Sequence, residues 1–298
     1  MAPKDVQNQE IRNGFPLTRV GITGLKKPVT VMRNGRLVVL VTEIDAFVDL
    51  PSTQKGSHMS RNVEVITEMI EGSMHGKVSS LEELSANICR QMLQKHEYAS
   101  FAEIHMSADY FLERKTASGR KTIESYKLLA RSTAKRAGEL RKMVGVEVSG
   151  MTACPCAMET VRHIMKDELP SLPDEMCMLP AITHNQRNFT QLLVEVPEAS
   201  DIEADDLIDI VESSLSSPTY AILKREDEAR VVINSHSNPK FVEDVVREIL
   251  SKMLEKYDSL PDDVHITVRS ESEESIHKHN AFAERVTTLR ALRSSTYD

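Results

Sequence analysis

Two cysteines separated by one residue, Cys154 and Cys156, are the first side chains whose spacing suggests chemistry. A thiolate is a soft ligand for zinc or ferrous iron, and His184 is a suitable imidazole partner. Four cysteines in 298 residues are too few and too irregularly spaced for a disulfide framework. Because cysteines are also common as small, half-buried apolar residues, the pair predicts a metal site only together with other evidence.

The segment from Glu274 to His279 carries a second group of reactive side chains. His277 and His279 share one face if this segment is extended, and they could then act on one bound molecule. Imidazoles titrate near neutral pH, so the pair suits proton transfer or metal ligation, and Glu274 could orient either ring. The alternative interpretation is a solvated polar turn.

Other charged residues could complete a metal site or bind a substrate. Glu226 and Glu228 belong to an acidic run, which could supply a ligand but is also typical of a solvated turn. Glu243 falls in the first turn of a predicted helix, where the helix dipole favours a carboxylate without any function. Arg19 and Arg61 could hold phosphate oxygens through their planar guanidinium groups, although their spacing alone carries no weight.

The pattern of apolar residues predicts alternating strands and helices in the first half. A β-branched run at 37–41 that continues towards residue 50 predicts a strand, and a polar loop containing glycine follows it over 51–61. Two helices come next, the first around Val63 to Ile70 and the second beginning at Ser79 or Ser80. Further strands are predicted as antiparallel hairpins at 101–113, 121–132 and 138–149.

The second half repeats this content after a connecting segment. That segment contains the cysteine pair, a short helix at 157–168 and a stretch interrupted by prolines from Pro170 to Pro180. The repeat predicts a duplicated α+β unit, with a first unit over 1–150, a connection carrying metal ligands over 151–187 and a second unit over 188–298. The second unit is predicted to contain a strand at 189–196, a helix at 205–215, strands at 219–224 and 229–235, a helix from Pro239 to Tyr257 with Pro239 in its first turn, and a strand at 263–270.

Composition excludes several classes of protein. The chain has 37 Lys and Arg against 45 Asp and Glu, a formal net charge of -8, which argues against a general nucleic-acid or anionic-membrane surface. No apolar run approaches the roughly 20 residues that span a bilayer, and the N-terminus lacks the apolar core of a secretory signal, so we expect a cytoplasmic protein. The sequence has neither a glycine-rich phosphate loop nor a Gly-x-Ser-x-Gly elbow.

Together these segments resemble the type IB GTP cyclohydrolases from Leu17 to about Ala283. Each motif is short, but the motifs occur in one order along the chain, which makes the combination specific. They are Leu17-Thr18-Arg19-Val20-Gly21, Asp49-Leu50-Pro51, Lys55-Gly56-Ser57-His58-Met59-Ser60-Arg61, Cys154-Pro155-Cys156, His184-Asn185-Gln186-Arg187, Leu223-Lys224-Arg225-Glu226-Asp227-Glu228, Asn238-Pro239-Lys240-Phe241-Val242-Glu243-Asp244 and Glu274-Ser275-Ile276-His277-Lys278-His279.

The resemblance implies the tunnelling fold, an α+β fold in which antiparallel sheets carry helices on one face. Members of the family are similar in having two such units per chain and in assembling as tetramers, with barrels formed by oligomerisation and active sites at subunit interfaces. Pairing of exposed sheet edges between subunits would remove those edges. We therefore expect a homotetramer.

The same resemblance implies roles for the residues singled out above. The catalytic metal would be held by Cys154, His184 and Glu228, with Glu226 as the fallback for Glu228 and His279 as a candidate further ligand. Glu243 resembles the carboxylate that anchors the purine by accepting two hydrogen bonds from the guanine edge. The substrate phosphates would be held by Arg19, Ser60 and Arg61, and the catalytic group would comprise Glu274, His277, His279 and Cys156.

The implied reaction opens the imidazole ring of the guanine of GTP. An activated water attacks C8, which leaves as formate, while His277, His279 and Glu274 shuttle protons during ribose rearrangement and closure of the pterin ring. Ferrous iron is the expected metal, and zinc or manganese are the alternatives. A thiolate, an imidazole and a carboxylate accept iron or zinc, so these ligands do not settle the metal.

The proline-interrupted segment between the cysteine pair and His184 is longer than in bacterial relatives, which favours the archaeal branch of the family. Archaeal members resemble this chain and make 7,8-dihydroneopterin 2',3'-cyclic phosphate for methanopterin or folate-like cofactors, whereas bacterial members make dihydroneopterin triphosphate. Two alternatives stay open. One is another tunnelling-fold enzyme acting on a purine or pterin. The other is a non-catalytic protein whose metal has four protein ligands and no open position.

Overall fold

The computed structural model describes residues 6–7, 13–33, 36–72, 80–168, 182–197 and 202–295. The chain forms two compact units that interleave along the sequence. The first unit comprises Met1–Tyr110, Lys127–Val144 and Glu195–Ala199, and the second comprises Phe111–Tyr126, Gly145–Val194 and Ser200–Asp298. The predicted units are instead continuous in sequence, with boundaries after residues 150 and 187, and that division stays a prediction.

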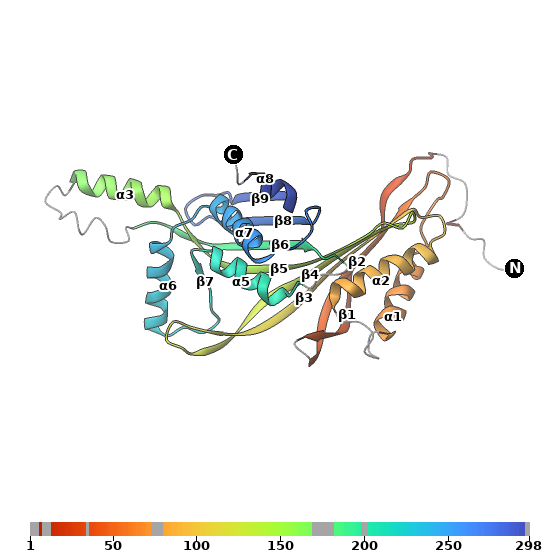
Figure 1. The fold of residues 1–298 in the computed structure, drawn as a ribbon, viewed down its shortest axis with the longest axis horizontal. Helices are drawn as coiled ribbons and strands as arrows, with labels where there is room; N and C mark the ends of the chain where they lie inside the picture. Colours follow the sequence, from red (N-terminus) through yellow and green to blue (C-terminus); the bar gives the residue numbers. More distant parts are fainter. Residues whose placement is uncertain are drawn as a thin grey trace. The chain divides into compact units, whose positions relative to one another are not determined.

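Strands that follow one another along the chain are mostly neighbours in the sheet (Figure 1). Their order is β1-β2-β3-β4-β5-β6-β8-β9, with β7 paired to β5. The pairs β1–β2, β2–β3, β6–β8 and β8–β9 are antiparallel, which confirms the predicted α+β class. The strands are β1 (Leu17–Arg33), β2 (Arg36–Leu50), β3 (Phe101–Lys115), β4 (Lys121–Lys135), β5 (Leu140–Ala153), β6 (Asn185–Glu195), β7 (Ser217–Pro218), β8 (His265–Glu273) and β9 (Ala281–Thr288).

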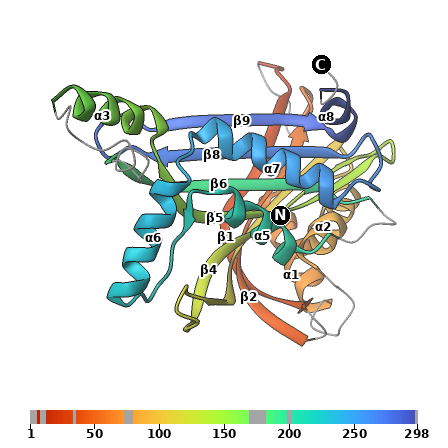
Figure 2. The same ribbon diagram turned by 60° about the vertical axis from the view of Figure 1, so that its left-hand side comes forward.

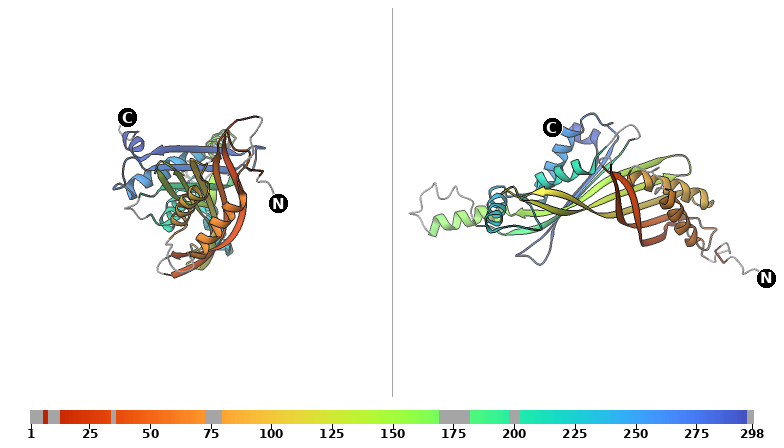
Figure 3. Two further views of the ribbon diagram at one scale, coloured as in Figure 1. Left: turned by 90° about the vertical axis from the view of Figure 1, so that its right-hand side faces the viewer. Right: turned by 90° about the horizontal axis from the view of Figure 1, so that it is seen from below.

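Two helices belong to the first unit. α1 (Met59–Gly72) packs against α2 (Leu81–Lys95) and against β1 (Figures 1 and 3). The predicted helix start is confirmed at Ser80, whose hydroxyl accepts a hydrogen bond from the Glu83 N–H at 3.4 Å. The residues of α2 at the predicted helical spacing form its buried face: Leu81, Leu84, Ile88 and Met92.

The predicted strands at 101–113, 121–132 and 138–149 are confirmed as β3, β4 and β5. Side chains of β4 alternate between buried positions and exposed or half-buried ones, as expected of a strand with one covered face. In the first eight residues of β3 the alternation is between half-buried and buried positions. The turn after β3 contains Gly119 at φ 81°, and its N–H donates to the Thr116 carbonyl at 2.8 Å. This left-handed conformation explains the glycine, because a side chain there would be strained.

In the second unit, α7 (Val242–Lys256) lies along β8 and β9 and packs against α5 (Ala204–Ser214) (Figure 2). α3 (Pro155–Glu168) continues directly from β5 and buries Met158. The remaining described helices are α6 (Arg225–Ser237) and α8 (Leu289–Ser295). No helix in the described part of the chain is long and apolar enough to cross a membrane.

Several predictions for the second half are wrong. Residues 219–224 form no strand, and 229–235 lie within α6. The β-branched run there suggested a strand, yet Val232 and Ile233 are 46% and 56% exposed on the helix, so no sheet face buries them. Helix α7 begins at Val242 and leaves Pro239 outside, because the Asp244 carboxylate accepts the Phe241 N–H at 3.0 Å and so defines the start.

Three strands and one stretch stand apart from the predicted elements. β1, β7 and β9 were outside the predicted set: glycines, lysines and a proline interrupt the alternation in β1, β7 has only two residues, and half of the residues of β9 are polar. The proline-interrupted stretch from Pro170 to Pro180 lies outside the described residues.

Candidate active site

The end of β5 and the start of β6 bring Cys154 and His184 together. The Cys154 N–H donates to the His184 carbonyl at 3.1 Å, and the Thr183 hydroxyl donates to the Cys154 carbonyl at 2.7 Å. Cys154 also starts α3, since its sulfur accepts the Ala157 N–H at 3.4 Å. Cys156 lies in the first turn of that helix and is exposed. The backbone therefore holds these two residues beside each other.

A row of buried polar side chains leads to this place along β6 and β8. The Asn188 side-chain amide donates to the hydroxyls of Ser270 and Ser272 at 2.8 and 2.9 Å, and the Thr190 hydroxyl donates to Asn188 Oδ1 at 2.7 Å. The register pairs Asn188 with Ser272, so alternate residues of both strands face the same side. All four side chains are fully buried. The alternation of polar residues from Gln186 to Thr190 was the signal in the sequence, and the site prediction missed it.

The row ends in a group of polar atoms without hydrogen-bond partners. His184 Nδ1 lies 3.6 Å from Glu274 Oε2, too far for a good hydrogen bond, and the two side chains are 12% and 9% exposed. Gln186 Nε2 donates to the other Glu274 oxygen at 3.3 Å. Three buried atoms of this group have no partner: His184 Nδ1, Gln186 Oε1 and Glu274 Oε2. Buried polar groups are normally satisfied, so this concentration indicates a place that receives a ligand.

His277 and His279 lie next to this group on an exposed turn, which is the alternative to the extended segment considered above. Residues 275–279 form bends between β8 and β9. The bends still bring the two rings together, stacked with centroids 5.1 Å apart, and the ring centroids of His184 and His277 are 6.3 Å apart. Asn280 anchors the segment by donating to Glu271 at 3.0 Å. The predicted neighbourhood of the histidine pair is therefore present, with a different backbone conformation.

Glu243 lies in the first turn of α7, as predicted, and its side chain is exposed. The helix start is tied to the cysteine segment by one backbone contact. The Lys240 N–H donates to the carbonyl of Ala153, the residue before Cys154, at 3.0 Å.

The predicted acidic ligands Glu226 and Glu228 lie in the first turn of α6, where both are exposed. Between them Asp227 is buried and accepts hydrogen bonds from the backbone and hydroxyl of Ser118 at 2.9 and 3.0 Å. Burial would raise the pKa of Asp227, but hydrogen bonds from Ser118, and after them from the Lys224 backbone and Thr116, together lower the pKa. Residues 223–228 and Ser118 line an open hollow, so the two glutamates face accessible space.

The last turn of α6, at the opposite end of the helix from Glu226 and Glu228, contacts Asn185, the residue after His184. The Asn185 amide lies 3.2 Å from His236 Nε2, in the last turn of α6. Eight residues separate Glu228 from His236, a rise of roughly 12 Å along a helix. The described residues of the chain contain no group of three or more His, Cys, Asp or Glu side chains that could hold a metal ion.

Three predicted phosphate contacts, Arg19, Ser60 and Arg61, belong to the first unit. Arg19 Nε lies 2.9 Å from Glu103 Oε2, and its guanidinium stacks over Phe47 at 4.3 Å. The Arg61 side chain donates to the Lys95 carbonyl at 3.1 Å, while Ser60 is exposed at the start of α1. Each guanidinium retains further N–H donors.

A buried histidine supports the loop that leads to Ser60 and Arg61. His96 Nε2 lies 2.6 Å from Asn62 Oδ1, and its Nδ1 lies 2.8 Å from the Tyr98 hydroxyl, which donates to Ser57. Burial, followed by the positive charges of Arg61 and His58, lowers the pKa of His96 to about 4. The imidazole is therefore neutral in the folded state at neutral pH.

This lowered pKa predicts a pH-dependent stability. An unfolded histidine titrates near 6.5, so the unfolded state binds more protons between pH 6.5 and about 4, and stability falls as the pH drops through that window. The loss amounts to at most about 3 kcal/mol. Urea unfolding at pH 7.5 and 4.5 checks it: His96→Gln is expected to reduce the pH dependence, and the exposed-residue control His163→Gln to keep it. Equal pH dependence in wild type and His96→Gln would contradict the prediction.

The sulfur and nitrogen atoms of Cys154 and His184 suit a divalent metal ion that binds both thiolate and imidazole. The structure supplies a half-buried thiol and a neighbouring imidazole whose Nδ1 has no partner, the two ligand types shared by zinc and ferrous iron. The unpartnered Glu274 oxygen beside that imidazole would serve as a further polar contact.

Sequence comparison gives relatives that cover almost the whole chain. The chain is 45% identical to the GTP cyclohydrolase MptA of Methanosphaera stadtmanae over 97% of its length and 96% of the relative. Identity to GTP cyclohydrolase MptA of Methanothermobacter thermautotrophicus is 45%, covering 93% and 91% of the two chains. Identity to the protein of the same name from Methanocaldococcus jannaschii is 42%, covering 97% and 96%.

Comparison of structures gives a fold likeness to uricases. The uricase of Arthrobacter globiformis matches with a TM-score of 0.51 and 6% identity over 91% of this chain and 93% of that one. A uricase from Bacillus fastidious matches with a TM-score of 0.51 and 9% identity over 94% and 96%. Uricase is a tunnelling-fold protein, so the likeness confirms the predicted fold class.

A comparison with models of protein families tests the family that the motifs predict. Residues 4–283 match the family described as type I GTP cyclohydrolase folE2. This range contains the cysteine pair, His184, the segments with Glu228 and Glu243, and the histidine pair. The chain therefore belongs to the type I GTP cyclohydrolase folE2 family.

Proposed function

We propose that this protein opens the guanine imidazole ring of GTP and releases C8 as formate. A ribose-derived hydroxyl displaces the β- and γ-phosphates as diphosphate, which gives 7,8-dihydroneopterin 2',3'-cyclic phosphate for the biosynthesis of methanopterin or folate-type pterins. The observation that carries the proposal is the group at the ends of β5, β6 and β8. There a thiol, an imidazole and a carboxylate with unpartnered buried atoms adjoin two stacked histidines. Metal ligands and proton carriers in one place are the parts that ring hydrolysis requires.

Cys154 and His184 would hold the metal, with Glu228 as the third ligand and Glu226 as its fallback. When bound, a divalent metal supplies Lewis-acid activation of water near neutral pH. We propose ferrous iron, with zinc or manganese as alternatives. His279 stays a candidate further ligand, because its ring stacks on the ring of His277, which in turn lies 6.3 Å from that of His184.

His277, His279 and Glu274 would move protons at the reacting purine. The histidine rings are stacked on a loop beside the ligand group, so one can accept a proton while the other donates. Glu274 is buried beside His184 and has one oxygen without a partner, so it can take part in the proton transfer. Cys156 is exposed in the first turn of α3, and we assign it to the lining of the site.

Glu243 would hold the guanine edge through two hydrogen bonds, from N1–H and from the 2-amino group. Its position in the first turn of α7, tethered to Ala153, supports this assignment. We assign the phosphates to Arg19, Ser60 and Arg61. The partners that the two arginines already have within the chain would fix their guanidinium groups before substrate binds.

The position of Glu228 supports an active site shared between subunits. This residue lies at the end of α6 that is remote from the contact between Asn185 and His236. A carboxylate delivered by a second copy would complete the ligand set, and the expected homotetramer would provide that copy. β1 and β9 are the end strands of the sheet within the described residues, and such edges could pair between subunits.

Product analysis tests the proposed function. We expect purified protein incubated anaerobically with GTP and ferrous iron to give a pterin whose mass matches the 2',3'-cyclic monophosphate. The methanogen relatives named GTP cyclohydrolase MptA support this product. A triphosphate product would move the protein to the bacterial type of reaction. Unchanged GTP with each of ferrous iron, zinc and manganese would contradict the proposal.

A further inference from the structure

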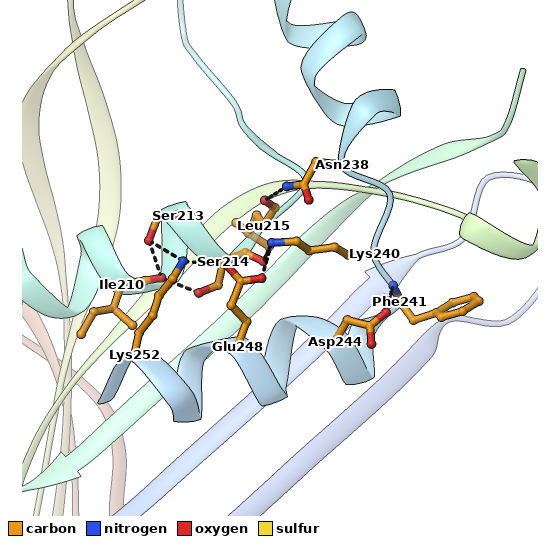
Figure 4. A network of polar contacts seen from close by, with 10 residues as sticks. All are labelled: Ile210, Ser213, Ser214, Leu215, Asn238, Lys240, Phe241, Asp244, Glu248 and Lys252. Carbon is orange, nitrogen blue, oxygen red and sulfur yellow. Dashed lines mark hydrogen bonds and ion pairs between the residues drawn. The ribbon is translucent and has the colours of Figure 1, made fainter. Parts of the chain in front are cut away.

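Lys240 has an unusual environment for a lysine, because its side chain is buried. Its relative exposure is 9%, whereas lysine normally reaches solvent. The ammonium donates to the Ser214 carbonyl at 3.0 Å and to the Glu248 carboxylate (Figure 4). Ser214 is the last residue of α5, so the ammonium also lies at the negative end of a helix dipole. These contacts of the buried ammonium hold the backbone around Lys240 in place against α5 and α7.

Glu248 links this ammonium to a second, more accessible cation. Lys252 Nζ donates to the other Glu248 oxygen at 2.7 Å and to the Ser213 hydroxyl at 3.0 Å (Figure 4). Burial opposes ionisation of Glu248, but the hydrogen bonds from Lys240 and Lys252 outweigh it and lower its pKa. The two lysines thus share one counter-ion, and only Lys240 lies in the turn before α7.

The turn that carries Lys240 is held from two sides. The Lys240 N–H donates to the Ala153 carbonyl at 3.0 Å, next to Cys154. The Asn238 side chain donates to the Leu215 carbonyl at 3.3 Å, and the Phe241 N–H donates to Asp244 at 3.0 Å (Figure 4). Helix α7 therefore starts from a turn clamped between the end of α5 and the end of β5.

We propose that Lys240 is a positioning residue that aligns Glu243 with the guanine edge and so determines the preference for guanine over hypoxanthine. This inference rests on the proposed function. Glu243 follows Lys240 by three residues, in the first turn of α7. Two parallel hydrogen bonds to N1–H and the 2-amino group need a carboxylate in one orientation, whereas a single bond to N1–H tolerates rotation. Loss of the clamp therefore weakens the contact to the 2-amino group first.

ITP reports this contact directly, because its hypoxanthine base keeps N1–H and lacks the 2-amino group. Lys240→Met retains the apolar stem and removes the ammonium. We expect it to lower the ratio of kcat/KM for GTP to that for ITP by about tenfold, mainly through KM for GTP. The bound metal is expected to stay at the wild-type level, because Cys154 and His184 are held by their own backbone hydrogen bond. A merely structural lysine would lower both activities together and leave the ratio unchanged.

Lys252→Met is the matched control, since it removes the other cation from Glu248 and leaves the turn alone. It is expected to keep the wild-type ratio. If Lys240→Met does not fold, Glu248→Gln removes the counter-charge while keeping an acceptor, and we expect a decrease of about threefold in the ratio. An unchanged ratio in the folded variant, with active wild-type protein, overturns the inference alone. Failure of wild-type protein to release formate overturns the proposed function instead.

Discussion

Replacement of Cys154 or His184 by alanine is expected to reduce formate release by at least about a thousandfold, through loss of the metal. The fold should survive, because the Cys154 thiol accepts one weak hydrogen bond and His184 Nδ1 has no partner to lose. The backbone bond between the two residues remains in both variants. Metal analysis of the purified proteins, together with kcat, checks the prediction.

The control for this pair is His163→Gln, which changes an exposed histidine on α3 and should keep both metal and rate. Full metal content and a normal rate in Cys154→Ala or His184→Ala would contradict the assignment of the ligands. Mixed assemblies of Cys154→Ala and Glu228→Ala subunits test the shared site. If Glu228 comes from a second subunit, random mixing restores about a quarter of the wild-type sites. If both ligands come from one chain, mixing restores none.

Replacement of Glu243 by alanine is expected to weaken GTP binding by roughly a hundredfold while leaving the metal content unchanged. The lost contact is a pair of charge-assisted hydrogen bonds, worth about 3 kcal/mol, which corresponds to that factor. Glu243 is exposed in the absence of substrate, so its removal leaves no buried group unpaired and should cost α7 only the helix-dipole contribution, about 0.3–1 kcal/mol. KM for GTP, the dissociation constant and the thermal unfolding midpoint are the measurements.

Glu255→Ala provides the matched change at the other end of the same helix, where the side chain is also exposed, and should leave GTP binding unaltered. Equal affinity of wild type and Glu243→Ala for GTP would remove Glu243 from the binding site. A loss of metal in Glu243→Ala would place it among the ligands rather than at the purine.

The sequence predicted the elements in which the pattern of apolar residues matches the side chains that the fold buries. The alternation in β4 places Tyr126, Leu128 and Ala130 on a buried face, and the Ser80 cap marks the start of α2. In α6 the two disagree. Val232 and Ile233 are residue types that favour a strand. The start of α6, however, is fixed by hydrogen bonds from Ser118 to the buried Asp227 carboxylate, and Ser118 is remote in sequence from this helix.

The site prediction could identify residue types but not most of their contacts. His277 and His279 were predicted to act together, and they do lie together, although through bends rather than an extended strand. Gln186 and the polar row behind it depend on the pairing of β6 with β8, which the sequence does not specify. The clamp on Lys240 likewise joins α5, β5 and α7, which are far apart in sequence.

Incubation with GTP labelled with ¹³C at C8 tests the central claim most directly. If the site opens the imidazole ring as proposed, the label appears in formate in a one-to-one ratio with pterin in wild-type protein, and the label stays in GTP with Cys154→Ala. Label that remains in a purine product, from folded and metal-loaded wild-type protein, would show that the ring is not opened and would contradict the account.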